Sequence, residues 1–293
     1  MPTLMAALVL ALATLPPPVK HHPVGRCVRV LGVTAPEDAR TAGFEYLELA
    51  LQDLLPLPDA EFAAVVTRMK AVGLPALSGY GFLPADSKVV GPSADPANID
   101  RQLKHGLGRA RRLGLGMVVF GNLNGKTRQV PDGFDRQRAE AQFLDFARRA
   151  AALGAQHGIT VLIEPMPARA TNLINTVAEG LALVRRVNHP RLQLLVDYGY
   201  LVESKEDVEI LHTAAPHIRQ IEIQNPNGRV YPRQADESDY AAFFQALRRG
   251  GYRGGFSVHG KPTVFFEDAP RAITLLRTLA AQHLAATGPN VRK

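Results

Sequence analysis

Two short strand-like runs that each lead into a carboxylate constrain the fold of this chain more than any other feature. Residues 159–163 (ITVLI) precede Glu164, and residues 192–196 (LQLLV) precede Asp197, with about one helix of chain between them. Runs of Leu and β-branched residues without strict alternation predict strands that are buried on both faces, which is typical of parallel sheets. The segment therefore predicts a strand, a helix and a second parallel strand.

The same alternation of strands and helices continues along the whole chain. The patterns predict strands at 27–33, 44–51, 74–78, 116–120, 159–163, 192–196, 218–223 and 255–258, and helices at 36–42, 59–72, 97–113, 134–157, 207–215, 239–249 and 268–287. Eight strand–helix units in a chain of 293 residues, 46% of them hydrophobic, predict one (β/α)8 barrel. We place this single domain at residues 27–287, followed by a short tail at 288–293.

Residues 1–26 differ from the rest of the chain. Residues 4–15 form an uncharged, mostly apolar run, and three prolines follow at 16–18. This run is too short to span a bilayer, so no membrane span is expected. Its length and the triplet 11–13 (ALA) fit a secretory signal peptide with a linker, although the usual basic segment before it is missing. The alternatives are a misassigned start or an added helix on a cytoplasmic protein.

Charge and cysteine content exclude some classes of protein. The formal net charge is +7, but Lys and Arg are scattered, and the densest cluster is Arg109, Arg111 and Arg112. That cluster lies at the end of a predicted helix, where basic side chains complement the helix dipole, so we expect no nucleic-acid partner. The single cysteine, Cys27, excludes an intramolecular disulfide and a zinc site built of cysteines.

Four potential metal ligands stand at or near the ends of the last four predicted strands. They are Glu164, Asp197, Glu222 and His259. The carboxyl ends of parallel barrel strands meet at one mouth, where barrels of this kind place their chemistry. Each residue alone could be a rim ion pair or an ordinary histidine. Together, three carboxylates and one imidazole predict a site for Mn²⁺, Mg²⁺ or Co²⁺, and could also bind Zn²⁺.

A second candidate feature follows the fourth predicted strand. Glycines at 121 and 125 precede Lys126 and Arg128, so backbone donors and positive charge could bind an anion there. The spacing is not that of a phosphate-binding P-loop. A flexible loop on the rim of the barrel is the alternative.

Several segments resemble one known family. Residues 163–200 (IEPMPARATNLINTVAEGLALVRRVNHPRLQLLVDYGY) resemble the core of the xylose-isomerase-like TIM barrels, the sugar phosphate isomerase/epimerase superfamily. The FGN loop, the NPNGRVYP loop and the segment GYRGGFSV resemble it too, in the same order, over about residues 27–286. Relatives in that superfamily include hydroxypyruvate isomerase, tagatose 3-epimerase, inosose dehydratase and 3-dehydroshikimate dehydratase. The resemblance implies the (β/α)8 fold.

The resemblance also implies one divalent metal, with Mn²⁺ as the first expectation and Mg²⁺, Co²⁺ or Zn²⁺ as alternatives. The family holds it with Glu, Asp, His and Glu from the last four strands. Glu164 and Asp197 match the first two ligands, but Glu222 stands where the family has His, and His259 stands where it has Glu. The number of donors and their summed charge are unchanged by this exchange, so we expect metal binding to survive.

Substrate contacts are implied in the same way. Arg229 matches a family arginine that contacts substrate, and Tyr200 stands where a substrate-contacting His is common. A tyrosine can still donate a hydrogen bond to a sugar oxygen. Glu48, Lys126 and Lys261 are further candidates for substrate contacts, with ordinary surface charge as the alternative.

The resemblance implies proton transfer on a small sugar-like substrate through an enediolate. Glu164 is the candidate general base and His259 the second acid or base; if His259 binds the metal, Glu222 could take that role. We expect an isomerase or epimerase, with a dehydratase or a non-catalytic sugar-binding derivative as alternatives, and a homo-oligomer is possible. The related endonuclease IV site needs extra histidines on earlier strands, which end here in Glu48, Ser78 and Asn122.

Overall fold

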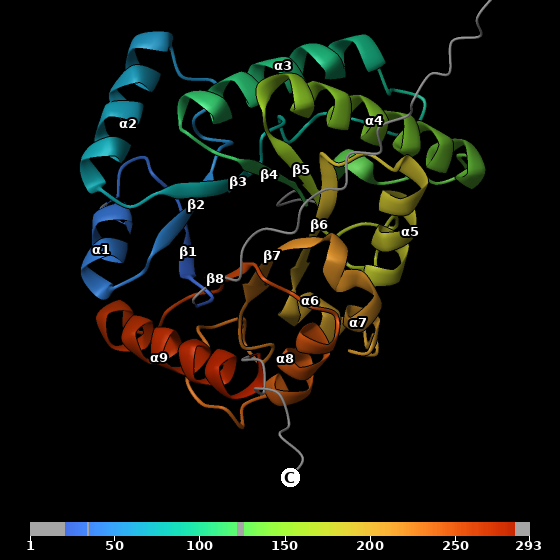
Figure 1. The fold of residues 1–293 in the computed structure, drawn as a ribbon. Coiled ribbons are helices and arrows are strands. Elements are labelled where there is room, and N and C mark those ends of the chain that lie inside the picture. Colours follow the sequence, from blue (N-terminus) through green and yellow to red (C-terminus); the bar gives the residue numbers. More distant parts are fainter. Residues whose placement is uncertain (1–20, 34, 122–125, 285–293) are drawn as a thin grey trace, which may run out of the picture.

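The chain folds into one closed barrel of eight parallel strands surrounded by helices (Figure 1). The computed structural model describes residues 21–33, 35–121 and 126–284. Neighbouring strands in the barrel are also neighbours in sequence, and β1 pairs with β8 to close the ring. This topology confirms the (β/α)8 barrel predicted from the alternation of strands and helices.

The barrel strands are short and regular. They are β1 (Val24–Val28), β2 (Tyr46–Ala50), β3 (Ala76–Tyr80), β4 (Met117–Phe120), β5 (Thr160–Ile163), β6 (Leu192–Asp197), β7 (Ile218–Ile223) and β8 (Gly255–Val258). The observed bounds of β7 and β8 are the predicted ones, whereas β1 begins three residues before the prediction.

The helices cover the outside of the ring. They are α1 (Ala35–Ala42), α2 (Asp59–Val72), α3 (Pro96–Arg112), α4 (Arg136–His157), α5 (Val177–Val187), α6 (Tyr198–Glu203), α7 (Ile210–Ala214), α8 (Tyr240–Arg249) and α9 (Phe265–His283), with the 3-10 turns η1 (Lys126–Arg128) and η2 (Ala215–His217). The prediction missed α6, which begins directly after β6. Asp197 starts it, because its side chain accepts a hydrogen bond of 2.8 Å from the Tyr200 backbone N–H.

Side chains alternate between the two faces of each strand and so form two separate interiors. Outward-facing residues such as Val118, Phe120 and Val161 join the main core between the barrel and its helices. Inside the ring lies a second, smaller apolar cluster, formed by Val119, Leu162 and Leu195 with Tyr80 and Met117 packed against it.

The inner wall of the barrel is apolar on one side and polar on the other. The apolar cluster belongs to β3, β4, β5 and β6. The inward positions of β1, β2, β7 and β8 instead carry hydrogen-bonding groups, namely Cys27, Tyr46, Glu48, Gln220, Glu222 and Ser257. We call this polar part of the barrel interior the throat, and it leads to the carboxyl ends of the strands.

The predicted signal peptide lies mostly outside the described residues, so export stays a prediction. The described chain begins with two contacts to the barrel: His21 Nε2 lies 2.6 Å from Glu45 Oε2, and His22 Nδ1 lies 2.7 Å from the Gly254 carbonyl oxygen. Within the described ranges, no helix combines the length and the apolar character needed to cross a membrane.

Candidate active site at the barrel mouth

Three of the four predicted metal ligands meet at the carboxyl ends of β6, β7 and β8. One ligand atom each from Asp197, Glu222 and His259 lies within 4.8 Å of the other two. His259 Nδ1 lies 2.6 Å from Glu222 Oε2 and 3.3 Å from Asp197 Oδ2. Both carboxylates are buried. We call these three residues the outer group.

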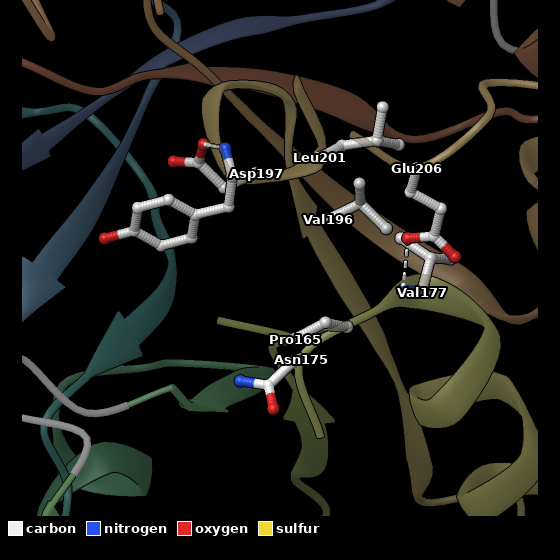
Figure 2. Close-up of a pocket in the computed structure, with 8 residues that line it drawn as sticks. Pro165, Asn175, Val177, Val196, Asp197, Leu201 and Glu206 are labelled. Atoms are coloured by element: carbon white, nitrogen blue, oxygen red, sulfur yellow. Dashed lines mark hydrogen bonds between the residues drawn. The ribbon is translucent and has the colours of Figure 1, made fainter. Parts of the chain in front are cut away.

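Strand register accounts for this meeting. Asp197 pairs with Glu222 across β6 and β7, and the His259 backbone N–H donates to the Ile223 carbonyl across β7 and β8. Figure 2 shows the Asp197 carboxylate on the opposite side of the strand end from the Val196 side chain, as alternation requires.

A glutamine that the sequence analysis did not single out orients Asp197. Gln224 Nε2 donates to both carboxylate oxygens of Asp197, at 3.0 and 2.8 Å. Gln224 Oε1 accepts from Arg229 Nε at 3.2 Å, and Arg229 donates at 2.9 Å to the Tyr200 hydroxyl. The two predicted substrate contacts, Tyr200 and Arg229, are therefore side by side. The sequence signal for Gln224 was its place two residues after Glu222, on the same face of the chain.

Within the outer group, the carboxylates of Glu222 and Asp197 stabilise the protonated form of the His259 ring. Burial alone would lower the pKa of the His259 ring, but the carboxylates of Glu222 and Asp197 outweigh burial and raise this pKa well above its usual value. A protonated ring between two carboxylates occupies the place that a cation prefers. The site therefore has the charge needed to bind a divalent ion once the imidazole is neutral.

Glu164 lies directly after β5 but is not a member of the outer group, so its assignment as a ligand stays a prediction. Its side chain covers Gly121, where an added Cβ would lie 1.4 Å from Glu164 Oε2. Burial, followed by the negative charges of Glu222 and Asp197, raises the pKa of the Glu164 carboxyl well above its usual value, against the opposing effect of His259 and Arg128. A buried carboxyl with a raised pKa suits a general base.

Arg128 has a different role from the one first considered. Residues 122–125 of the predicted anion-binding loop lie outside the described residues, and Arg128 is only 1% exposed. Its guanidinium donates to the carbonyl oxygens of Glu164 at 2.8 Å, Ile174 at 3.3 Å and Phe120 at 3.4 Å. The anion-binding interpretation is wrong for Arg128, because the residue is buried and its two terminal NH₂ groups donate to these backbone carbonyls.

The other predicted substrate contacts occupy different depths. Glu48 is fully buried, with 0% exposure, in the throat rather than on the rim. Gln220 Nε2 contacts Glu48 Oε2 at short range, and the Cys27 thiol donates to the same oxygen at 3.4 Å. Lys126 and Lys261 are exposed, after β4 and β8 respectively. Contact of any of the three with a substrate stays a prediction.

A small cavity lies behind the outer group, between the ends of β5 and β6 (Figure 2). Pro165, Val177 and Leu201 are among its lining residues. Glu206 closes one side, where it accepts hydrogen bonds from the Val177 and Ala178 backbone N–H groups at 2.6 and 2.9 Å. Glu206 thus satisfies the first backbone N–H groups of α5, and Asp197 and Tyr200 also line this cavity.

The structure is a closed (β/α)8 barrel that carries buried carboxylates, an imidazole and hydrogen-bond donors at the carboxyl ends of its strands, where barrels of this fold place their active sites. Comparison with known proteins identifies the family. Residues 36–279 match the model of the family described as "Xylose isomerase-like TIM barrel". The chain belongs to this family.

The relatives are sugar isomerases and epimerases. The chain is 28% identical over 134 residues to a Homo sapiens protein named "Putative hydroxypyruvate isomerase", a match that covers 43% of this chain and about half, 48%, of that protein. It is 26% identical to an L-ribulose 3-epimerase of Mesorhizobium japonicum over 85% of this chain and 82% of that one. The fold matches a D-allulose 3-epimerase from Methylomonas with a TM-score of 0.74, 21% identity, and coverage of 89% and 98%.

Proposed function

We propose that this protein is a divalent-metal-dependent isomerase or epimerase that moves a proton within a small polyhydroxylated carbonyl compound. The observation that carries the proposal is the convergence of Asp197, Glu222 and His259 within 4.8 Å at the mouth of a barrel of this family. The sugar isomerases and epimerases among its relatives support the substrate class.

The residues at the mouth fit a divalent ion. Asp197, Glu222 and His259 would hold it, because two carboxylates and an imidazole are donors that Mn²⁺ accepts readily, with Mg²⁺, Co²⁺ and Zn²⁺ as alternatives. Gln224 fixes the orientation of Asp197 through its hydrogen bonds, as partners behind a metal ligand commonly do. When bound, such an ion supplies Lewis-acid polarisation of the substrate carbonyl.

Glu164 supplies the general base in this proposal. Its backbone is fixed on both sides: its N–H donates to the Phe120 carbonyl at 3.2 Å, and its own carbonyl accepts from Arg128. Its side chain rests against Gly121. A carboxylate that is held in this way can remove a proton from a carbon of a bound substrate and return it to the neighbouring position.

Tyr200 and Arg229 bind the hydroxyl groups of the substrate. Both are anchored through the hydrogen-bond chain that runs from Asp197 through Gln224. Their donors would therefore keep a constant position relative to the outer group, which favours one orientation of the substrate. The apolar inner wall formed by Val119, Leu162 and Leu195 limits water on the opposite side.

The test is exchange of substrate carbon-bound hydrogen for deuterium in heavy water. Purified protein, stripped of metal and reloaded with Mn²⁺, Mg²⁺, Co²⁺ or Zn²⁺, is incubated with a panel of small ketoses and with dehydroshikimate-like compounds. We expect metal-dependent exchange into at least one ketose, and Glu164→Gln should abolish it. Release of water from the dehydroshikimate-like compounds, without ketose exchange, would identify a dehydratase instead.

A non-catalytic derivative is the second candidate, and the contact of His259 with both carboxylates favours it. If the His259 imidazolium remains between Glu222 and Asp197, a metal ion cannot bind to these two carboxylates. Bound sugar without exchange under any metal would support that function and contradict the isomerase proposal. A titration in which none of the four ions changes the melting temperature or releases heat would contradict metal dependence itself.

A further inference from the structure

A second group of potential ligands lies deeper in the throat, below the outer group. One ligand atom each from Cys27, Glu48 and Glu222 lies within 4.8 Å of the other two. These residues come from β1, β2 and β7, and Glu222 also belongs to the outer group. Two ligands of one ion are at most about 4–5 Å apart, because each bond to a metal such as Zn²⁺ is about 2.0–2.3 Å long.

Unpartnered oxygen atoms gather in this part of the barrel. Among the described residues, Glu48 Oε1, Ser78 Oγ and Gln220 Oε1 are buried and accept or donate no hydrogen bond. Ser78 is the register neighbour of Glu48 on β3, and Gln220 lies against Glu48. Buried acceptors without donors are costly, and a cluster of them requires a positively charged occupant or a proton.

The positive charges of the barrel are already engaged elsewhere. Glu48 is fully buried and makes no ion pair with Lys or Arg among the described residues. His259 contacts Glu222 and Asp197, and Arg128 donates to backbone carbonyls. The donors that do reach Glu48 are the Gln220 amide, the Cys27 thiol and the Ser257 hydroxyl, and all three are neutral groups.

We propose that the throat holds a second divalent cation, bound by Cys27, Glu48 and Glu222, with Glu222 shared between this ion and the outer group. Binding breaks the S–H bond of Cys27, forms a sulfur–metal bond and releases one proton to solvent for each ion, with no change of oxidation state. A thiolate selects Zn²⁺ or Co²⁺ over Mg²⁺ or Mn²⁺, so the two sites would prefer different ions.

The inference rests on residues that the proposed isomerase does not need, apart from Glu222. Cobalt is the probe, because Co²⁺ bound to a thiolate absorbs strongly in the near ultraviolet and Co²⁺ bound to oxygen and nitrogen does not. Cys27 is the only cysteine of the chain, so any such band reports the throat.

The experiment titrates the full-length, metal-free protein with Co²⁺ while recording the near-ultraviolet spectrum, the protons released and the cobalt bound per chain. We expect two cobalt ions per chain and a thiolate band that saturates with one of them. Cys27→Ser should remove the band and one cobalt, and Glu48→Gln, which removes a charge with little change of shape, should weaken the band-forming ion at least tenfold.

Asp197→Asn is the matched control, because it alters the outer group and leaves the throat residues intact. It should weaken the cobalt that gives no band and keep the band. The proposal is overturned if saturating Co²⁺ gives no thiolate band in the unmodified protein, or if the band persists in Cys27→Ser. Failure of the outer site alone would appear as one cobalt with the band, which separates the two proposals.

Discussion

Gly121→Ala is the substitution that most directly tests the position of Glu164. The added Cβ would lie 1.4 Å from Glu164 Oε2, 2.5 Å from its Cδ and 2.7 Å from its Cβ. An ordinary contact begins at 3.4 Å, so the carboxylate must move by about 2 Å, the difference between 3.4 and 1.4 Å. The backbone cannot easily follow, because the Glu164 N–H and C=O are bound by Phe120 and Arg128.

The expected loss can be estimated from this displacement. A misplacement of 1 Å at a reacting group costs about 100-fold in rate, so we expect a fall of at least about 100-fold in the exchange rate, or about 2.7 kcal/mol. Overpacking at a buried position costs about 1–3 kcal/mol of stability. The affinity for the metal should change little if Asp197, Glu222 and His259 hold it, because no atom of these residues is among the nearest neighbours of the new Cβ.

Gly116→Ala provides the matched control, because Gly116 directly precedes β4 and Gly121 directly follows it. Gly116 is exposed, its backbone is not left-handed, and an added Cβ would meet nothing within 4 Å. Hydrogen exchange into the substrate, chemical unfolding and metal titration are measured for both variants. Wild-type exchange rates in Gly121→Ala would refute the assignment of Glu164 as the base, and a large loss of metal affinity would show that Glu164 is a ligand after all.

Four further predictions concern the charged and titratable groups of the mouth and throat. The double variant with Glu222→His and His259→Glu should lose less metal affinity than either single variant. Purely additive effects on the affinity would exclude coupling between the two residues. Arg128→Met removes the donor of the buried Glu164 carbonyl and should lower the free energy of unfolding by roughly 2 kcal/mol. Arg128→Lys should recover part of this loss, and equal unfolding curves would contradict the prediction. Burial and the neighbouring Glu48 raise the pKa of the Cys27 thiol, so in the metal-free protein alkylation at pH 8 should be slow until urea unfolds it. For the same reason stability should fall as pH rises past about 9, where only the unfolded chain releases the thiol proton.

The strands could be predicted from the sequence because buried strands produce a local pattern of apolar and β-branched residues. β7 and β8 have the predicted bounds, and Glu222, one residue before the end of β7, and His259, directly after β8, lie at the mouth. The convergence of Asp197, Glu222 and His259 followed from the rule that parallel strands share one active end. No distance was needed for that prediction.

Depth inside the barrel could not be predicted in this way. Glu48 was predicted as a substrate contact, with ordinary surface charge as the alternative, but the alternation of β2 and its register shift beside Leu47 bury it in the throat against Gln220. Arg128 was considered as part of an anion-binding loop, but its guanidinium is buried and donates to the Glu164 carbonyl. Both outcomes depend on contacts between strands or loops that are distant in sequence, about which local pattern carries no information.

The exchange of Glu and His between β7 and β8 has a consequence for the throat. Gln220 and Glu222 of β7 and Gln224 directly beyond its end alternate along one face of the chain, so a carboxylate at the middle position reaches both the outer group and Glu48. A histidine there, which the resemblance implies for the family, would offer no carboxylate oxygen to share. The exchange leaves the summed charge of the four mouth residues unchanged and places a carboxylate oxygen near Cys27. The proposed deeper cation site therefore depends on having Glu, and not His, at position 222.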